Sequence, residues 1–325
     1  MSHFFQMKYY TFALPNTNYY FNTMRKKTLL VALLFASIGC FAQPKAGALQ
    51  KVLESERGFM CPVWSPDSRK IAVTGDNFKG IWVAEIDGSR LIQLCKDDGA
   101  GYKMAWNEDG SQILARTNVY KGNRIFHELK AFDTHTLKAE TLMPATRGLS
   151  VATWRSNEKI ALNKESKGFS LSRKGNLEKT ALSIFEKMVA DPFNAIQQIA
   201  SLKQLQKPII NPALSPDKTK VAFQIVGEGI YSCDIDGSNA KFLGKGAYPT
   251  WTPDNKYVIA AKISDNGEIF TASTLLAINV ETAAQTVFFN DSKMIPMTPA
   301  VSPDGKRVAF ENTVDGSIYT IEIIY

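Results

Sequence analysis

A twelve-residue pattern recurs along this chain of 325 residues, and it limits the possible folds more than any other feature. It reads PVWSPDSRKIAV from position 62, PALSPDKTKVAF from 212, PTWTPDNKYVIA from 249 and PAVSPDGKRVAF from 299. Weaker copies surround Trp106-Asn-Glu-Asp and Trp154-Arg-Ser-Asn. The six copies are 37 to 60 residues apart, and a repeat of this length is typical of a blade or a solenoid unit.

Each copy continues in the same order. The turn leads to an apolar strand such as KIAV or KVAF, a loop follows, and a second strand such as GIWVAEID or GIYSCDID comes next. At Asp87 and Asp236 an Asp-Gly-Ser turn then precedes a short last strand. Asp-Gly between β-branched runs indicates a hairpin, because glycine accepts the positive φ of the turn. Such small sheets bury their faces only by stacking. We therefore predict an all-β fold, a six-bladed β-propeller of four-stranded blades.

The ends of the repeat array predict how the ring closes. The last copy lacks a fourth strand, whereas residues 47–55 precede the first copy without a blade of their own. We expect this N-terminal strand to complete the last blade, so that no sheet edge stays open there. Residues 181–206 lengthen one spacing and carry an apolar residue at every third position from Ile196 to Leu205. We expect a short helical insertion there, between blades three and four and packed on one rim, within a propeller that spans residues 47–325.

The N-terminal part has the layout of an export signal. From Met24 a basic stretch is followed by an apolar run that is too short to span a bilayer comfortably, and small residues precede Gln43. We expect a signal peptide at 24–42, cleaved after Ala42, and residues 1–23 to be a non-native upstream extension. A lipid anchor at Cys40 is the alternative reading. The expected location is the periplasm or outside the cell, without a transmembrane span.

The net charge of +7 does not indicate a nucleic-acid partner. Four of the 38 basic residues and none of the 31 acidic residues lie before position 43, which leaves 34 basic against 31 acidic residues, a net charge of +3. No strong positive field remains. The cysteines of this part are Cys61, Cys95 and Cys233, an odd and sparse set that predicts free buried thiols rather than a disulfide framework.

The repeated WSPDSRKIAV and VSPDGKRVAF, followed by strands such as IYSCDIDGSNAKFL, resemble the WD-repeat-like Pro-Asp β-propeller repeats of bacterial envelope proteins, among them the TolB propeller domain. The resemblance covers roughly residues 47–325. It implies the propeller fold and a binding role in the envelope, although many functions share this scaffold. No Gly-x-Ser-x-Gly sequence occurs, so the serine hydrolase of related peptidases is not expected in this chain.

The repeated residues themselves are expected to serve the fold. Proline presets φ in the Ser-Pro-Asp turn, and the serine and aspartate bond back to the backbone. The four repeat tryptophans, at 64, 106, 154 and 251, are expected to pack between blades, although a sugar-binding aromatic is the alternative. His127 and His135 need not converge, and no phosphate-binding glycine loop occurs. No cofactor, metal or catalytic residue is predicted.

Function is therefore expected in the loops that differ between copies. The connections between second and third strands, and between successive blades, gather on one side of a propeller, and here they are rich in polar residues. The candidate ligand-binding residues of these rim loops are Asn77, Tyr102, Lys103, Tyr120, Arg124, Arg147, Asn266 and Asp291. Two long hairpins, in blades two and five, are expected to flank a ligand. The favoured function is a non-catalytic scaffold that binds a protein or glycan of the bacterial cell envelope. The alternative is a carbohydrate-active enzyme with its site at the mouth of the channel.

Overall fold

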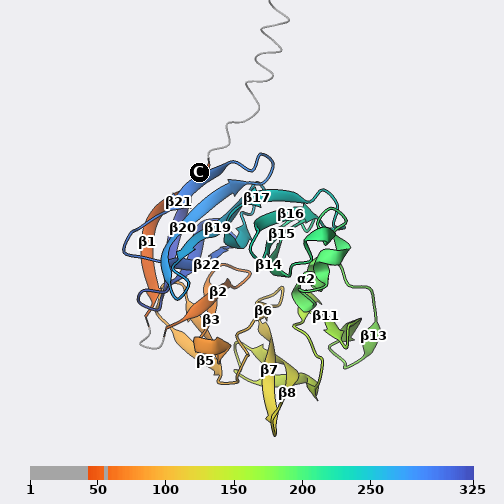
Figure 1. Cartoon of the computed structure of the whole chain (residues 1–325). Coiled ribbons are helices and arrows are strands. Elements are labelled where there is room, and N and C mark those ends of the chain that lie inside the picture. The colour runs from red at the N-terminus through yellow and green to blue at the C-terminus, as the bar shows by residue number, and fades with distance from the viewer. Residues whose placement is uncertain (1–42, 55–57) are drawn as a thin grey trace, which may run out of the picture. The chain divides into compact units, whose positions relative to one another are not determined.

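Every blade predicted from the repeat is present as a four-stranded antiparallel sheet in the computed structural model, which describes residues 43–54 and 58–325. Between Pro44 and Ile324 the six sheets follow one another around a ring, as Figure 1 shows. The predicted fold class, a six-bladed β-propeller, is confirmed. The expected signal segment 24–42, the lipid-anchor site Cys40 and the extension 1–23 lie outside the described residues.

The strands are numbered along the chain. Blade one consists of β2 (Met60–Trp64), β3 (Lys70–Thr74), β4 (Ile81–Glu85) and β5 (Leu91–Cys95). Blade two consists of β6 (Ala105–Trp106), β7 (Gln112–Lys121), β8 (Arg124–Asp133) and β9 (Ala139–Thr146). Blade three consists of β10 (Thr153–Ser156), β11 (Lys159–Lys164), β12 (Lys167–Ser172) and β13 (Leu177–Lys179). Blade four consists of β14 (Ile209–Leu214), β15 (Lys220–Ile225), β16 (Gly229–Asp234) and β17 (Lys241–Gly244). Blade five consists of β18 (Ala247–Trp251), β19 (Tyr257–Asp265), β20 (Phe270–Asn279) and β21 (Gln285–Phe289). Blade six consists of β22 (Pro296–Val301), β23 (Arg307–Asn312), β24 (Ser317–Ile324) and β1 (Lys45–Leu53).

The ring closes as the sequence predicts. Strand β1 pairs antiparallel with β24, from Lys45 opposite Ile324 to Leu53 opposite Ile318. The outer strand of blade six therefore comes from the N-terminal side and its three inner strands from the C-terminal side. This pairing leaves no open edge on β24 and ties the two ends of the repeat array together.

The Ser-Pro-Asp aspartates serve their own turns. In the first copy the Asp67 carboxylate accepts a hydrogen bond from Ser65 Oγ at 2.6 Å and another from the backbone N–H of Arg69 at 3.1 Å. Ser65 Oγ in turn accepts from the N–H of Lys70 at 2.9 Å. The copies at Asp217, Asp254 and Asp304 repeat this arrangement. Each aspartate is thus occupied by its own turn.

The repeat tryptophans link neighbouring blades. Each indole N–H donates to a carbonyl on the innermost strand of the preceding blade: Trp64 to Ala300 at 2.8 Å, Trp106 to Val63 at 3.1 Å, Trp154 to Ala105 at 3.1 Å and Trp251 to Ala213 at 2.9 Å. The acceptor occupies the same repeat position each time, directly before the tryptophan or its replacement. This bears out the predicted packing role of the tryptophans.

The insertion between blades three and four contains α2 (Ile184–Ala190) and the short 3₁₀ helices η2 (Ala195–Gln198) and η3 (Lys203–Leu205). The apolar spacing of three residues reflects 3₁₀-type bonds, because the N–H groups of Ile199, Leu202 and Leu205 each donate to the carbonyl three residues earlier, at 2.9–3.1 Å. In such turns side chains three residues apart lie on one face. The apolar residues at every third position therefore do form one face, but the turns that carry them are 3₁₀ turns, which are tighter than an α-helix.

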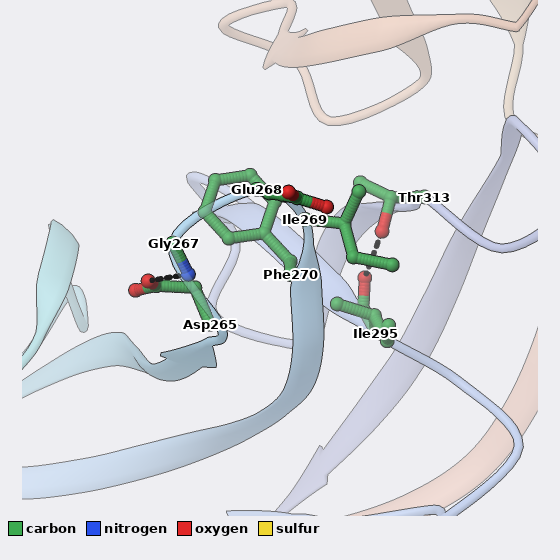
Figure 2. A pocket seen from close by; sticks show the side chains of 7 residues that line it. All are labelled: Asp265, Gly267, Glu268, Ile269, Phe270, Ile295 and Thr313. Atoms are coloured by element: carbon green, nitrogen blue, oxygen red, sulfur yellow. Dashed lines mark hydrogen bonds between the residues drawn. The ribbon is translucent and has the colours of Figure 1, made fainter.

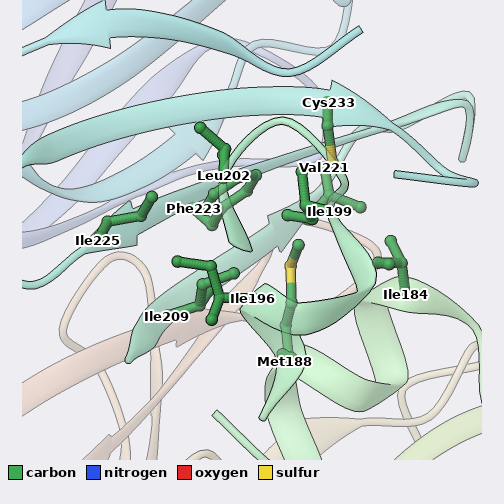
Figure 3. Packing of buried hydrophobic residues seen from close by; sticks show 11 residues of the cluster. Ile184, Met188, Ile196, Ile199, Leu202, Ile209, Val221, Phe223, Ile225 and Cys233 are labelled. Carbon is green, nitrogen blue, oxygen red and sulfur yellow. The ribbon is translucent and has the colours of Figure 1, made fainter. Parts of the chain in front are cut away.

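The insertion lies between the blades, which corrects the expectation that it packs on one rim. Its side chains form a buried cluster with Phe223 and Ile209 of blade four, as Figure 3 shows. On the other side α2 contacts β11, and its Glu186 accepts two hydrogen bonds from Arg155 of β10, at 2.6 and 2.8 Å. Blade four carries Leu214 where the linking tryptophan would stand. The segment therefore takes the place of direct packing between blades three and four.

Candidate functional site at the mouth of the ring

One face of the ring carries the connections between second and third strands and between successive blades, because neighbouring strands run antiparallel. We call it the loop face, and the opposite side, with the Ser-Pro-Asp turns, the turn face. All eight candidate residues of the rim loops lie on or next to loop-face connections. The long hairpins β7–β8 and β19–β20 also end on this face, and their strands are 9 or 10 residues long.

The inner strands share a backbone distortion where they start from the loop face. In five blades the residue three positions before the linking tryptophan or its replacement has a positive φ. These residues are Cys61 (54°), Lys103 (53°), Asn211 (50°), Tyr248 (55°) and Thr298 (46°). The pairing of inner and second strands shifts register at four of these positions. A β-bulge of this kind turns a side chain away from the regular pleat, and such bulges are frequent near binding sites.

The second strands place polar side chains beside these bulges. One position of the second strand is polar in three blades: it is Arg116 in blade two, Gln224 in blade four and Glu311 in blade six. In each blade it lies three residues after the residue that pairs with the repeat tryptophan or its replacement. In blade four Asn211 Nδ2 donates to Gln224 Oε1 at 3.0 Å. In blade six Thr298 Oγ1 donates to Glu311 Oε2 at 2.9 Å. Blade two differs, because both of its residues, Lys103 and Arg116, are cations.

Glu311 is the buried acid of this mouth, with a relative exposure of 7%. Besides Thr298, the backbone N–H of Cys61 in blade one donates to its carboxylate at 2.5 Å. Burial raises the pKa of Glu311, although both hydrogen bonds oppose the shift. Burial also raises the pKa of Tyr248, and the neighbouring Glu311 and Cys61 add to that shift. The mouth therefore brings together polar groups from blades one, five and six.

Cations gather in blade two. Burial lowers the pKa of Lys103 to about 8, and the positive charge of Arg116 adds to this effect. Burial lowers the pKa of the Arg116 guanidinium as well. His127 on β8 lies near them: burial and then the charge of Arg116 lower its pKa, and its Nδ1 is 3.1 Å from Asn118 Oδ1.

The candidate residues have different surroundings. Tyr102 and Lys103 belong to the cationic group of blade two. Asn266 and Asp291 instead accept hydrogen bonds from backbone N–H groups within their own turns, at 2.9–3.0 Å. The other four, Asn77, Tyr120, Arg124 and Arg147, are exposed.

Sequence reasoning missed Arg116, Glu311 and Tyr248. A signal was present for the first two, since ILAR and VAFE each place a charge directly after an apolar strand run. Tyr248 could have been found from its place in the repeat, since it stands three positions before Trp251 just as Lys103 stands before Trp106.

Three hollows follow one another across blades five, six and one on the loop face. The first, of about 560 Å³, lies beside the β19–β20 hairpin, and Figure 2 shows its lining by Asp265, Gly267, Glu268, Ile269, Phe270, Ile295 and Thr313. The second, of about 440 Å³, shares Thr313 and reaches Glu311. The third, of about 510 Å³, shares Phe59 and Asp76 with the second. The first two linings combine apolar and acidic side chains, and the third also contains Lys79 and Lys96.

Residues 43–54 and 58–325 contain no group of three or more His, Cys, Asp or Glu side chains placed to hold a metal ion. None of their helices is long and apolar enough to cross a membrane. Cys61, Cys95 and Cys233 are free, as predicted, although only Cys233 is fully buried.

Comparison with known proteins supports the fold. No protein-family model and no curated protein sequence matches the chain. Among solved structures, a putative TolB from Agrobacterium tumefaciens aligns over 87% of this chain and 99% of its own, with a TM-score of 0.50 and 12% identity. TolB from Acinetobacter baumannii aligns over 87% of this chain and 64% of its own, with a TM-score of 0.45 and 12% identity. An oligogalacturonate lyase in complex with manganese aligns over 83% and 78%, with a TM-score of 0.47 and 14% identity. The chain is a six-bladed β-propeller similar in fold to the putative TolB from Agrobacterium tumefaciens, and at 12% identity the likeness concerns the fold alone.

Proposed function

We propose that this chain is an exported, non-catalytic β-propeller that binds a partner on its loop face and acts as a scaffold in the bacterial cell envelope. The partner is a protein or a glycan of the envelope, and the surface favours a protein. The observation that carries this proposal is the tip of the β19–β20 hairpin. There Ile269 is 66% exposed and Phe270 45% exposed, directly beside the hollow of about 560 Å³.

Apolar side chains that are exposed together beside a hollow are typical of interaction surfaces. Val314, on the neighbouring β23–β24 connection, is 60% exposed and extends the apolar area. Asp265 and Glu268 add negative charge at the edge of the same hollow. A protein segment with an apolar anchor flanked by basic residues would complement this surface. The second long hairpin carries Tyr120 and Ile125, which are 57% and 52% exposed and offer a further contact.

The test replaces both apolar side chains of the tip, Ile269→Ser with Phe270→Ser. The matched control is Val287→Ser, because Val287 is 64% exposed but lies on the outermost strand of the same blade. Purified proteins are incubated with envelope extract, and the recovered proteins are quantified by mass spectrometry. We expect a partner recovered by the wild type and the control to be reduced about tenfold or more with the tip variant. Equal recovery with all three proteins would refute this binding surface.

The partner class and the location need separate measurements. Binding of the wild type to an array of envelope glycans, lost in the tip variant, would assign the surface to a glycan instead. Cell fractionation and sequencing of the mature N-terminus test export. A protein that begins at Gln43 agrees with cleavage after Ala42, a lipidated Cys40 selects the anchored form, and an uncleaved cytoplasmic protein contradicts the proposal.

A second candidate function, a carbohydrate-active enzyme with its site at the mouth, rests on Glu311. A buried carboxyl with a raised pKa is a suitable general acid, and Tyr248 lies near it. The assay measures release of reducing ends from a panel of envelope and plant polysaccharides by the wild type and by Glu311→Gln. Activity that falls about a hundredfold or more in the variant would favour the enzyme. No activity of the wild type, or equal activity of both proteins, would count against it.

A further inference from the structure

Two cations of blade two share one aromatic ring at the mouth. The ammonium of Lys103 and the guanidinium carbon of Arg116 each lie 5.8 Å from the centre of the Tyr102 ring. Phe78 packs its ring against Tyr102 in an edge-on contact, with the ring centres 5.1 Å apart. Both cationic side chains are partly buried. Two positive charges therefore lie around one ring, near enough for the charge of Arg116 to act on Lys103, in a place from which much of the water is excluded.

Neither cation has an acidic partner among residues 43–54 and 58–325. The acidic residues of the neighbourhood pair with other lysines: Asp97 and Glu128 with Lys130, at 3.0 and 3.1 Å, and Asp98 with Lys79, at 3.4 Å. Buried or partly buried charges in proteins are normally paired. Lys103 and Arg116 depart from this rule although carboxylates are available in the same blade.

Arg116 also has unused hydrogen-bonding capacity. Its Nη1 donates to the carbonyl of Leu149 at 3.3 Å, which fixes the guanidinium across the gap between blades two and three. Its Nε is buried and has no hydrogen-bond partner among the described residues. A buried donor without an acceptor costs free energy, so such groups need an explanation. A ligand that supplies a hydrogen-bond acceptor to Arg116 would be such an explanation.

The backbone conformation of Lys103 also supports a missing counter-charge. Lys103 adopts its positive φ of 53°, and a non-glycine residue there carries strain. In blades four and six the residue at this bulge bonds to the second-strand residue beside it. In blade two the same geometry brings two like charges together, which is unfavourable without a counter-charge.

We propose that Lys103 and Arg116, with Tyr102 beside them, form an anion-binding site that takes a carboxylate or phosphate group of a small ligand. The guanidinium suits an oxyanion, because its planar N–H groups match two oxygen atoms. The ammonium adds a second positive charge. The site lies in blade two, away from the apolar tip of blade five, and does not depend on the proposed binding of a partner there.

The test uses two probes, inorganic phosphate and succinate, titrated into the intact propeller by calorimetry at constant ionic strength with chloride as the reference anion. The site variants are Lys103→Gln and Arg116→Gln. The control is Lys79→Gln, because Lys79 is a cation of the same face with a side-chain exposure of 64%. We expect at least one probe to bind the wild type and the control, and both site variants to bind about tenfold or more weakly. The preferred probe identifies the phosphate or the carboxylate class.

A second measurement separates an anion site from a purely structural role. Lys103 loses its proton around pH 8. Succinate keeps its charge above about pH 6.5, so its affinity for the wild type should fall as the pH rises from about 7 to about 9. In the absence of ligand, Lys103→Gln should melt no lower than the wild type, since it removes an unpaired charge. No binding of either probe to the wild type at about 10 mM, or equal affinities in all variants, would overturn the proposal.

Discussion

The linking tryptophans allow a direct test of how the blades are held together, and Trp106→Phe is the most informative change. Trp106 belongs to a degraded copy of the repeat, yet its indole N–H still donates to the Val63 carbonyl of blade one at 3.1 Å. Phenylalanine keeps an aromatic ring but removes the donor. Trp82 provides the matched control. It is partly buried like Trp106 and contacts Phe59 edge-on at 5.6 Å, but among the described residues its indole donates no hydrogen bond.

The expected effect follows from the single lost hydrogen bond. A neutral hydrogen bond contributes about 0.5–1.5 kcal/mol net, and a buried carbonyl that is left unpaired adds to the loss. Both replacements remove similar indole area, so that contribution largely cancels between them. We therefore expect Trp106→Phe to lower the free energy of unfolding by ~1 kcal/mol more than Trp82→Phe does. For a domain of this size that difference corresponds to about 2–4 °C in the melting temperature.

The measurement is thermal and urea unfolding followed by circular dichroism, because tryptophan fluorescence changes with the substitution itself. Trp154→Phe, which loses a bond of the same length, should behave like Trp106→Phe. If Trp82→Phe destabilises the protein as much as the two linking variants, the inter-blade hydrogen bond contributes nothing measurable. The tryptophans would then act through packing area alone.

Three further experiments test other parts of the structure. The raised pKa of Glu311 contributes stability that is fully present below the unfolded value of 4.5 and is lost as the pH rises through the folded value. The difference in melting temperature between the wild type and Glu311→Gln should therefore change with pH in this range, and a pH-independent difference would contradict it. Ile199→Ala, within the fully buried cluster of the insertion, should cost about 2–5 kcal/mol in urea unfolding, and a loss below ~1 kcal/mol would show that the insertion does not join the blades. Burial raises the pKa of Cys233 to about 12, so iodoacetamide should label it only after unfolding, and rapid labelling of the native protein would refute its burial.

Much of the fold could be predicted because the repeat contains its own structural signals. Turn chemistry, strand patterns and copy number are local in sequence, and they correctly indicated six blades and the closing strand. The apolar stripe of the insertion was also local. Its packing was not, since a stripe shows which side chains are buried but not what covers them. The sequence placed the insertion on a rim, whereas the chain fills the space between two blades.

The mouth was harder to predict for a related reason. Which side of a strand faces the centre depends on the pleat, and a bulge shifts that alternation by one residue. Five inner strands have a positive φ at this position and four of them shift register there, so a regular alternation does not show which side chains face the centre. Arg116 and Glu311 lie on second strands, outside the polar loops that the sequence indicated as binding residues. Asn266 was predicted as a binding residue because it is polar, but its Oδ1 accepts hydrogen bonds from two backbone N–H groups of its own turn.

The repeat itself separates the residues that build the ring from those that distinguish one blade from another. A positive φ outside glycine costs on the order of 1 kcal/mol or more, and the chain adopts it at the same position in five blades. The side chains at that position nevertheless differ: a cysteine, a lysine, an asparagine, a tyrosine and a threonine. A structural requirement for a particular side chain would make them alike, as it does for the aspartates of the turn face. The backbone at the mouth is therefore repeated in five blades while its chemistry varies, and blade two differs by placing two unpaired cations there.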